Sequence, residues 1–143
     1  MMSSLDLIVD RLADPAVRSL LGLSMGSASP ERIDRVAASY AEGGHRLLFG
    51  SHRDGRIVGL VGVELLEKGR ATVLHIAVDE EFRSLGLGRS LVTEVIRELD
   101  LAVLSAETDD EAVGFYEQCG FAIRPAVRRF GTRRFACELR RAD

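Results

Sequence analysis

The segment from residue 70 to residue 106 constrains the fold more than any other part of the sequence. Its first ten residues, RATVLHIAVD, predict a strand over 70–79 because β-branched and apolar residues dominate them. Residues 88–99 then place apolar side chains at helical spacing on one side. The fully apolar run LAVLSA at 101–106 is typical of a strand buried on both faces, as in a parallel pair. The three segments predict a β-α-β unit with parallel strands.

Two helices are expected before this unit. Asp14-Pro15 and Ser29-Pro30 each place proline in the first helical position after a residue suited to N-capping. The first pair predicts a helix over 15–22, and the second predicts a helix that ends at Gly43-Gly44. Residues 5–9 fit helical spacing and a short strand equally well, so that segment is left open.

Antiparallel strands are expected on both sides of the β-α-β unit. Residues 45–52 and 56–67 predict a hairpin around the turn pair Asp54-Gly55. Residues 121–125 and 133–140 predict a final hairpin after a short helix. We therefore expect an α/β fold with a mixed, mainly antiparallel sheet, a central parallel strand pair and about four flanking helices.

Composition and length exclude several classes of protein. A chain of 143 residues with 46% apolar and 29% charged residues supports a single globular domain over residues 1–143. No apolar run reaches the ~20 residues of a membrane span, and the N-terminus does not resemble a signal peptide. Cys119 and Cys137 form no CxxC motif or disulfide framework, and the three histidines lack metal-ligand spacing. We expect a cytoplasmic protein with no membrane partner and no metal.

The C-terminal region is strongly basic. Residues 121–143 hold seven arginines against two acidic residues, a local net charge of +5 in a chain of net charge −3. These arginines could meet a phosphate group or an acidic partner, or line the solvent face of the last strands. Nucleic acid is not expected as a partner, because aromatic residues are only 6% and no binding motif accompanies the arginines. The exposed edge of the terminal strand pair could also pair with a second copy, so a homodimer is a further expectation.

The turn between the predicted strand 70–79 and the following helix contains Gly86-x-Gly88. Glycines at this spacing allow a tight turn, and the first N–H groups of a helix attract anions such as pyrophosphate. A dinucleotide-binding loop would require a third glycine where this chain has Leu91. A nucleoside-triphosphate loop would require Gly-Lys-Ser/Thr, which is absent.

The remaining motif, Arg83-x-x-Gly86-x-Gly88, resembles that of the GNAT superfamily of acetyl-CoA-dependent N-acetyltransferases. Members of this family bind the pyrophosphate of coenzyme A with amides around the motif. The resemblance implies pyrophosphate contacts from Arg83, Ser84, Leu85, Gly86, Leu87, Gly88, Arg89 and Ser90. It also implies that the pantetheine arm pairs with the backbone of Ile76, Ala77 and Val78 as an added strand would.

A second motif strengthens the resemblance. Asp109-x-x-Ala112-x-x-Phe115-Tyr116, followed by Gly120-Phe121, is similar to the family signature Asn-x-x-Ala-x-x-x-Tyr with a later Gly-Phe. In family members the tyrosine lies beside the sulfur of coenzyme A and protonates the leaving thiolate. The resemblance implies that Tyr116 is the general acid and that Asp109 and Ala112 contact the cofactor, although asparagine is usual at the position of Asp109. A core tyrosine is the alternative interpretation of Tyr116.

No residue clearly occupies the position of a general base. The glutamates that family members use would stand at Thr72 or Leu104, and neither position is acidic here. His75 on the predicted strand and Glu107, placed just beyond the strand at 101–106, are the remaining candidates. Glu107 could also bind a cationic amine, whereas a packed histidine and a solvated carboxylate are the simpler interpretations of the two.

The resemblance implies transfer of an acetyl group from acetyl-CoA to a primary amine, which is a small molecule, an amino acid or a peptide. Direct attack of the amine in a ternary complex requires no nucleophile from the enzyme, so the lack of a Ser-His-Asp or Cys-His set is no objection. The alternative is a non-catalytic module that binds or senses acyl-CoA. Release of free thiol in the presence of candidate amines distinguishes the two.

Overall fold

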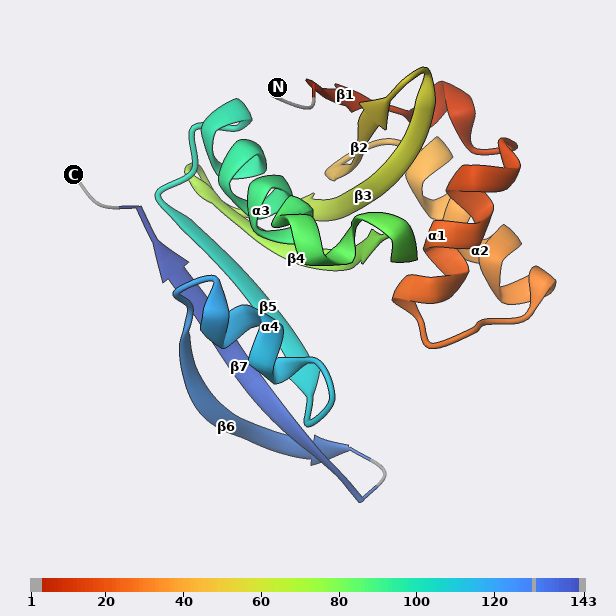
Figure 1. Cartoon of the computed structure of the whole chain (residues 1–143). Helices are drawn as coiled ribbons and strands as arrows, with labels where there is room; N and C mark the ends of the chain where they lie inside the picture. The colour runs from red at the N-terminus through yellow and green to blue at the C-terminus, as the bar shows by residue number, and fades with distance from the viewer. Residues whose placement is uncertain (1–3, 130, 142–143) are drawn as a thin grey trace.

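The structure, a computed structural model, describes residues 4–129 and 131–141 (Figure 1). Seven strands form one sheet in the order β1-β2-β3-β4-β5-β7-β6. Every neighbouring pair is antiparallel except β4 and β5, which are parallel, so the expected fold class is confirmed. The elements in chain order are β1 (Ser4–Leu7), η1 (Val9–Arg11), α1 (Pro15–Ser24), α2 (Pro30–Ala41), β2 (Arg46–Arg53), β3 (Arg56–Leu65), β4 (Arg70–Val78), η2 (Glu80–Leu85), α3 (Leu87–Glu98), β5 (Val103–Asp109), α4 (Val113–Gln118), β6 (Ala122–Arg129) and β7 (Thr132–Arg140).

The first two helices begin where the capping residues predict. The Asp14 side chain accepts a hydrogen bond from the Ala16 amide, and Ser29 accepts one from the Arg32 amide. The predicted end of the first helix near Gly22 is wrong by two residues. Gly22 is an interior glycine that lets α2 approach α1 closely, because a Cβ there would lie 3.0 Å from Ile33 Cδ1.

Two segments differ from the sequence-based expectation, or are left open by it, because of contacts with distant parts of the chain. Residues 4–7 form the edge strand β1, which pairs with β2, and the chain then turns through the 3₁₀ helix η1. The strand expected at 101–106 runs instead from Val103 to Asp109. It begins later because the Leu101 amide still bonds to the end of α3 and the Ala102 amide to Gly69. It extends further because β7 pairs with it up to Asp109.

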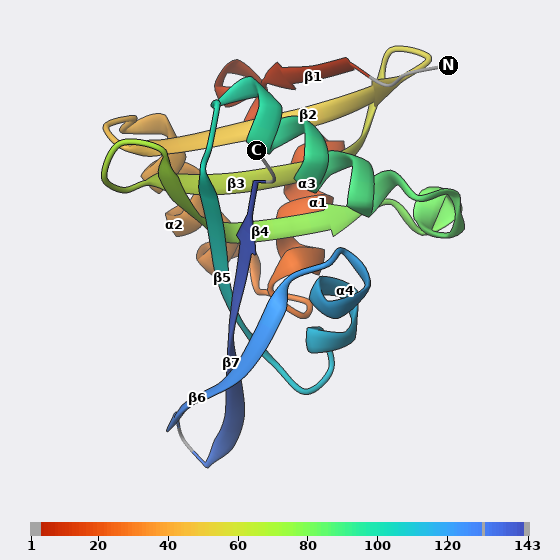
Figure 2. The same cartoon turned by 90° about the vertical axis from the view of Figure 1, so that its left-hand side faces the viewer.

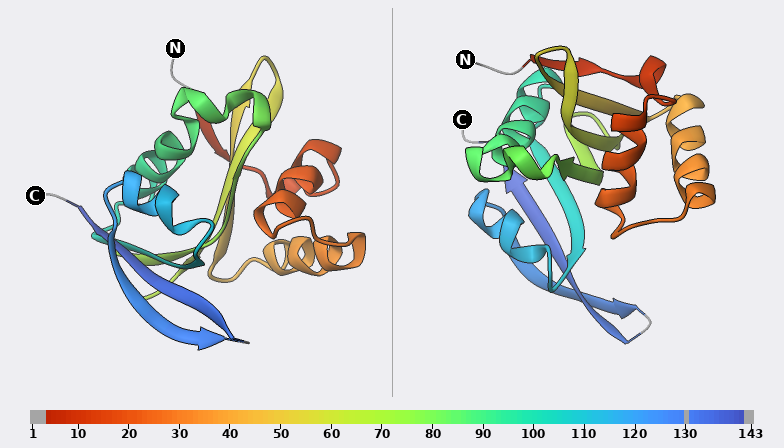
Figure 3. Two further views of the ribbon diagram at one scale, coloured as in Figure 1. Left: turned by 60° about the horizontal axis from the view of Figure 1, so that its bottom comes forward. Right: turned by 45° about the vertical axis from the view of Figure 1, so that its right-hand side comes forward.

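The core lies in two layers, one on each face of the sheet (Figure 3). On one face, α1 and α2 pack Leu21 and Tyr40 against β2 and β3. On the other face, α3 and α4 pack Leu91 and Tyr116 against the central strands. β4 contributes side chains to both layers, and its edge is where the functional site forms.

Candidate functional site

The divergence of β4 from β5 opens a cleft near the middle of the sheet. The two parallel strands pair only where residues 70–72 face residues 103–105, and they then run apart (Figure 2). The cleft has a volume of about 1300 Å³. Beyond Thr72, β4 has no strand partner on its β5 side within the described part of the chain. Ile76, Ala77 and Val78 line the cleft, and their unpaired edge leaves room for the strand-like ligand arm that the sequence predicts.

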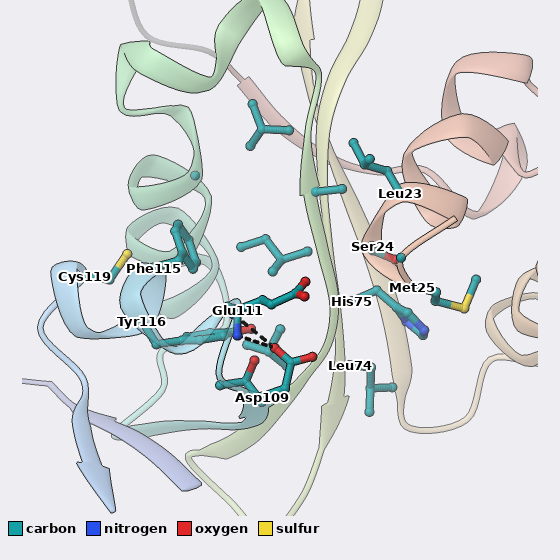
Figure 4. Close-up of a pocket in the computed structure, with 18 of the residues that line it drawn as sticks. Leu23, Ser24, Met25, Leu74, His75, Asp109, Glu111, Phe115, Tyr116 and Cys119 are labelled. Carbon is teal, nitrogen blue, oxygen red and sulfur yellow. Dashed lines mark hydrogen bonds between the residues drawn. The ribbon is translucent and has the colours of Figure 1, made fainter. Parts of the chain in front are cut away.

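A bulge in β4 determines which side chains face each side of the cleft. Gly62 of β3 is opposite His75 and Val63 is opposite Val73, so Leu74 is the extra residue. Val73 packs on the α3 side, whereas Leu74 and His75 both lie on the α1–α2 side (Figure 4). Regular alternation would have placed His75 on the opposite face.

The Gly-x-Gly motif forms the start of α3 at one wall of the cleft. Gly86 is the N-cap residue and adopts a left-handed conformation with φ of +76°. A Cβ on Gly88 would lie 2.8 Å from Phe115 Cε1, so this glycine allows α4 to pack against the end of α3. Both glycines line the cleft. The first N–H groups of α3 have no intrahelical acceptor and lie where the sequence predicts that an anion binds.

Two arginines reinforce this wall. The Arg83 side chain donates to the Val78 carbonyl at 3.2 Å, and Arg89 donates to the Gln118 carbonyl at 2.9 Å. Both line the cleft together with Ser84, but the predicted residues Leu85, Leu87 and Ser90 do not. Leu87 is buried against the sheet, and Leu85 is largely exposed.

Tyr116 projects from α4 into the cleft (Figure 4). Only 6% of the residue is exposed, and its ring lies edge-on to those of Phe115 and Phe121. Burial raises the pKa of Tyr116 well above its usual range, so the phenol keeps its proton at neutral pH. No described residue hydrogen-bonds to the hydroxyl. The proton is therefore available to a ligand.

The second motif shapes the turn before α4. The Asp109 carboxylate accepts hydrogen bonds from the amides of Glu111 and Ala112 at 3.1 and 3.0 Å. This Asx turn lies directly before α4, whose Tyr116 faces β4 (Figure 4). Asp109 and Ala112, which the resemblance implies as cofactor contacts, both line the cleft. The charge of Asp109 is directed at its own backbone, which explains how a carboxylate can occupy a position where the family usually has asparagine.

Glu107 lines the cleft from within β5, not from beyond the end of that strand. The prediction that it follows the strand is wrong, because β5 continues to Asp109 and Glu107 pairs with Ala136 of β7. Its side chain is 42% exposed and accepts a bond from Arg134 Nε at 3.3 Å. Glu107 thus belongs to an ion pair that borders the cleft.

His75 lines the opposite side of the cleft, where the Tyr40 hydroxyl lies 2.5 Å from its Nδ1. Burial, with added repulsion from Arg46 and Arg32, lowers the pKa of His75 to about 4. Both candidate bases therefore border the cleft, but His75 and Glu107 lie in very different environments.

Sequence reasoning missed several residues of the α1–α2 side. Leu23, Ser24 and Met25 at the end of α1, with Arg32 and Val36 of α2, line the cleft. The only sequence signal for the buried Tyr40 is its helical spacing from Val36 and Ile33, which marks an inward face and no chemistry.

Within residues 4–129 and 131–141, no group of three or more His, Cys, Asp or Glu is arranged to hold a metal ion. None of the helices there is long and apolar enough to cross a membrane.

Known proteins share this sequence pattern and fold. The family model described as "Acetyltransferase (GNAT) family" matches residues 15–121. A curated relative from Arabidopsis thaliana, GCN5-related N-acetyltransferase 2, chloroplastic, is 30% identical over 73 residues. That match covers 49% of this chain and only 28% of the plant protein.

Solved structures agree with the family model. A GNAT-family protein from Desulfovibrio desulfuricans superposes with a TM-score of 0.77 at 22% identity, covering 97% of this chain and 99% of the other. A GNAT acetyltransferase from Elizabethkingia anophelis with acetyl-CoA bound superposes with a TM-score of 0.70 at 19% identity, covering 96% and 97% of the two chains. Since the family model spans most of the sequence, the chain belongs to the GNAT family of acetyltransferases.

Proposed function

We propose that this protein transfers the acetyl group of acetyl-CoA to a primary amine by direct attack, with Tyr116 as the general acid. The observation that carries the proposal is the position of the Tyr116 hydroxyl. It opens into the cleft that also holds the N-terminal end of α3, and burial keeps it protonated. The acceptor is a small amine, an amino acid or a peptide.

The bound donor would lie with its pyrophosphate at Gly86 and the first turn of α3, and with its pantetheine arm along the free edge of β4. The thioester would then be near Tyr116. The amine nitrogen forms a bond to the thioester carbon, the carbon–sulfur bond breaks, and the thiolate takes the phenol proton. The proton lost from the amine passes to solvent or to a base, and the Tyr116 phenolate regains a proton from solvent before the next turnover. Holding the two substrates together supplies much of the rate.

Thiol release from acetyl-CoA with a panel of primary amines tests this proposal. Tyr116→Phe should lower kcat by about 100-fold, the lower range for a general acid, because the leaving thiolate loses its proton source. The thermal stabilisation by acetyl-CoA should be unchanged, since the ring and its contacts with Phe115 and Phe121 remain. An unaltered kcat would remove Tyr116 from the chemistry. Stabilisation of the wild type without any thiol release would instead favour an acyl-CoA-binding module.

A further inference from the structure

Tyr40 and His75 form a polar pair, buried on the Tyr40 side, that the proposed chemistry does not use. Tyr40 belongs to α2 and is only 1% exposed, whereas His75 belongs to β4 and borders the cleft. The Tyr40 hydroxyl lies 2.5 Å from His75 Nδ1, and the rings meet edge to face with centroids 5.6 Å apart. This contact joins α2 to β4, the strand whose unpaired edge borders the cleft.

Two backbone features make room for the pair. Gly62 lies opposite His75 in the sheet, and a Cβ there would overlap the Tyr40 hydroxyl and lie 2.5 Å from its Cζ. The bulge at Leu74 turns His75 toward α2. A glycine and a bulge at adjacent positions therefore both serve the same contact.

The hydrogen-bonding capacity of the pair determines where the protons are. Burial raises the pKa of Tyr40 well above its usual range, and burial with Arg46 and Arg32 lowers that of His75, so both groups are neutral at pH 7. Among the described residues, His75 Nδ1 is the one acceptor that the Tyr40 hydroxyl contacts. A buried hydroxyl needs an acceptor, so Tyr40 donates to Nδ1 and the imidazole proton is on Nε2.

The second ring nitrogen is available to a ligand. No described residue hydrogen-bonds to Nε2, which is not among the buried atoms lacking a partner. His75 therefore presents an N–H group to the cleft, while its basic lone pair is occupied by Tyr40. The charged groups near the pair are Arg32 of α2, Arg46 of β2 and Glu64 of β3, and the last two are paired with each other at 3.2 Å.

The carboxylates that line the cleft lie away from this donor, although arginines occur on both sides. The described carboxylates of the cleft, Glu107, Asp109 and Glu111, all come from β5 and the turn that follows. The α1–α2 side contributes Arg32, whose side chain has no ion partner among the described residues, and the apolar residues Leu23 and Val36. A hydrogen-bond donor and a cation on this side favour a ligand oxygen.

We propose that Tyr40 is a positioning residue that holds His75 as a hydrogen-bond donor to an oxygen of the acetyl acceptor, so that His75 is not the base. The acceptor class is an amine that also carries a carboxylate or amide oxygen, such as an amino acid or a peptide. This inference rests on the proposed function for the identity of the site, but the protonation of His75 can be tested without any transfer.

Nitrogen-15 spectra of histidine-labelled protein test which ring nitrogen of His75 carries the proton. We expect His75 to show an unprotonated Nδ1 and a protonated Nε2, and Tyr40→Phe to shift it toward a mixture of tautomers. The phenyl ring of this variant still fills the space at Gly62, so folding should survive and thermal unfolding checks it. His45 and His52 in the same spectrum are internal controls. A protonated Nδ1 in the wild type, or no change in Tyr40→Phe, would overturn the proposal even if acetyl transfer is observed.

Kinetics with leucine, leucinamide and 3-methylbutylamine test the acceptor class. Two substitutions of His75 are compared with these amines. His75→Gln keeps an N–H group near the position of Nε2, whereas His75→Leu removes it. His75→Leu should raise KM for leucine and leucinamide by about tenfold, which corresponds to one hydrogen bond, and His75→Gln by about threefold or less. KM for 3-methylbutylamine should change little in either variant.

The base hypothesis predicts a different pattern. A base at His75 would make both variants lose kcat equally with all three amines, and that result would overturn the proposal. His45→Gln, an exposed position outside the cleft, is the matched control for the substitution itself.

Discussion

The two sides of the cleft present different kinds of groups to a ligand. The α3 side presents mainly backbone groups, namely a left-handed glycine, the first amides of a helix and the free edge of β4, with Arg83 and Arg89 beside them. The α1–α2 side presents side chains, with His75 held by Tyr40 and Arg32 near it. Backbone groups bind a ligand whose chemistry does not vary, as expected for the coenzyme. Side chains can change with the acceptor, so substitutions on the two sides should affect different kinetic constants.

The largest effect should come from Gly62→Ala. The new methyl group would overlap the Tyr40 hydroxyl inside the core, and the ring has no free space into which it can move. We expect the free energy of unfolding to fall by about 3 kcal/mol, the upper end of the usual cost of overpacking. Urea denaturation measures this. In the folded fraction, acetyl-CoA affinity should be retained while the acceptor KM rises.

Gly114→Ala is the matched control for that substitution. A Cβ on Gly114 would meet nothing within 4 Å, and the residue lies in α4. It should be neutral or raise the free energy of unfolding by up to about 1 kcal/mol. Equal stability of the two variants would mean that Tyr40 does not occupy the space at Gly62.

Gly86→Val should disrupt the α3 side of the cleft, where the coenzyme is expected to bind. A φ of +76° costs an L-residue about 1–2 kcal/mol, and a branched side chain resists it further, so the turn before α3 must move. If the turn relaxes away from the binding conformation and gains about 1.4 kcal/mol, acetyl-CoA binding becomes about tenfold weaker. Calorimetry measures this change in affinity.

Gly55→Val is the control that separates the effect of backbone strain from the loss of acetyl-CoA binding. Gly55 has a φ of +77° in the β2–β3 turn, away from the cleft, and a Cβ there also meets nothing within 4 Å. Both variants should lower Tm, but only Gly86→Val should weaken acetyl-CoA binding. If the affinity of Gly86→Val is unchanged, the α3 end is not the pyrophosphate site.

The smallest effect should come from Glu107→Gln. Glu107 is 42% exposed and already paired with Arg134, so its attraction for a cationic amine is weakened by solvent and by that arginine. We expect the amine KM to rise by about threefold, consistent with the ~0.2–1 kcal/mol of an exposed ion pair, with kcat unchanged. A large loss of kcat would instead identify Glu107 as the base.

Glu138→Gln is the control for Glu107→Gln, because Glu138 also pairs with an arginine, Arg140, but lies outside the cleft lining. It should leave both kinetic constants as they are.

Local patterns were sufficient for much of the fold. The caps at Asp14 and Ser29, the turn at Asp54-Gly55 and the parallel strands on either side of α3 all follow from short-range chemistry. The misjudged segments depend on distant partners. β5 extends to Asp109 because β7, which comes later in the chain, pairs with it. The close approach of Ile33 of α2 explains why a glycine lies inside α1.

By itself, the sequence determined the turn and helix that are expected to hold the coenzyme, because Gly86, Gly88 and the strand before them lie close together in the chain. Their conformations follow from the residues themselves. Only the tertiary structure decided the environment of His75. Its partner Tyr40 is 35 residues away, and its orientation depends on a bulge that appears only when β4 pairs with β3. A histidine in a strand pattern carries no sign of the hydroxyl that will bond to it, because that contact exists only after the helix and sheet layers have packed together.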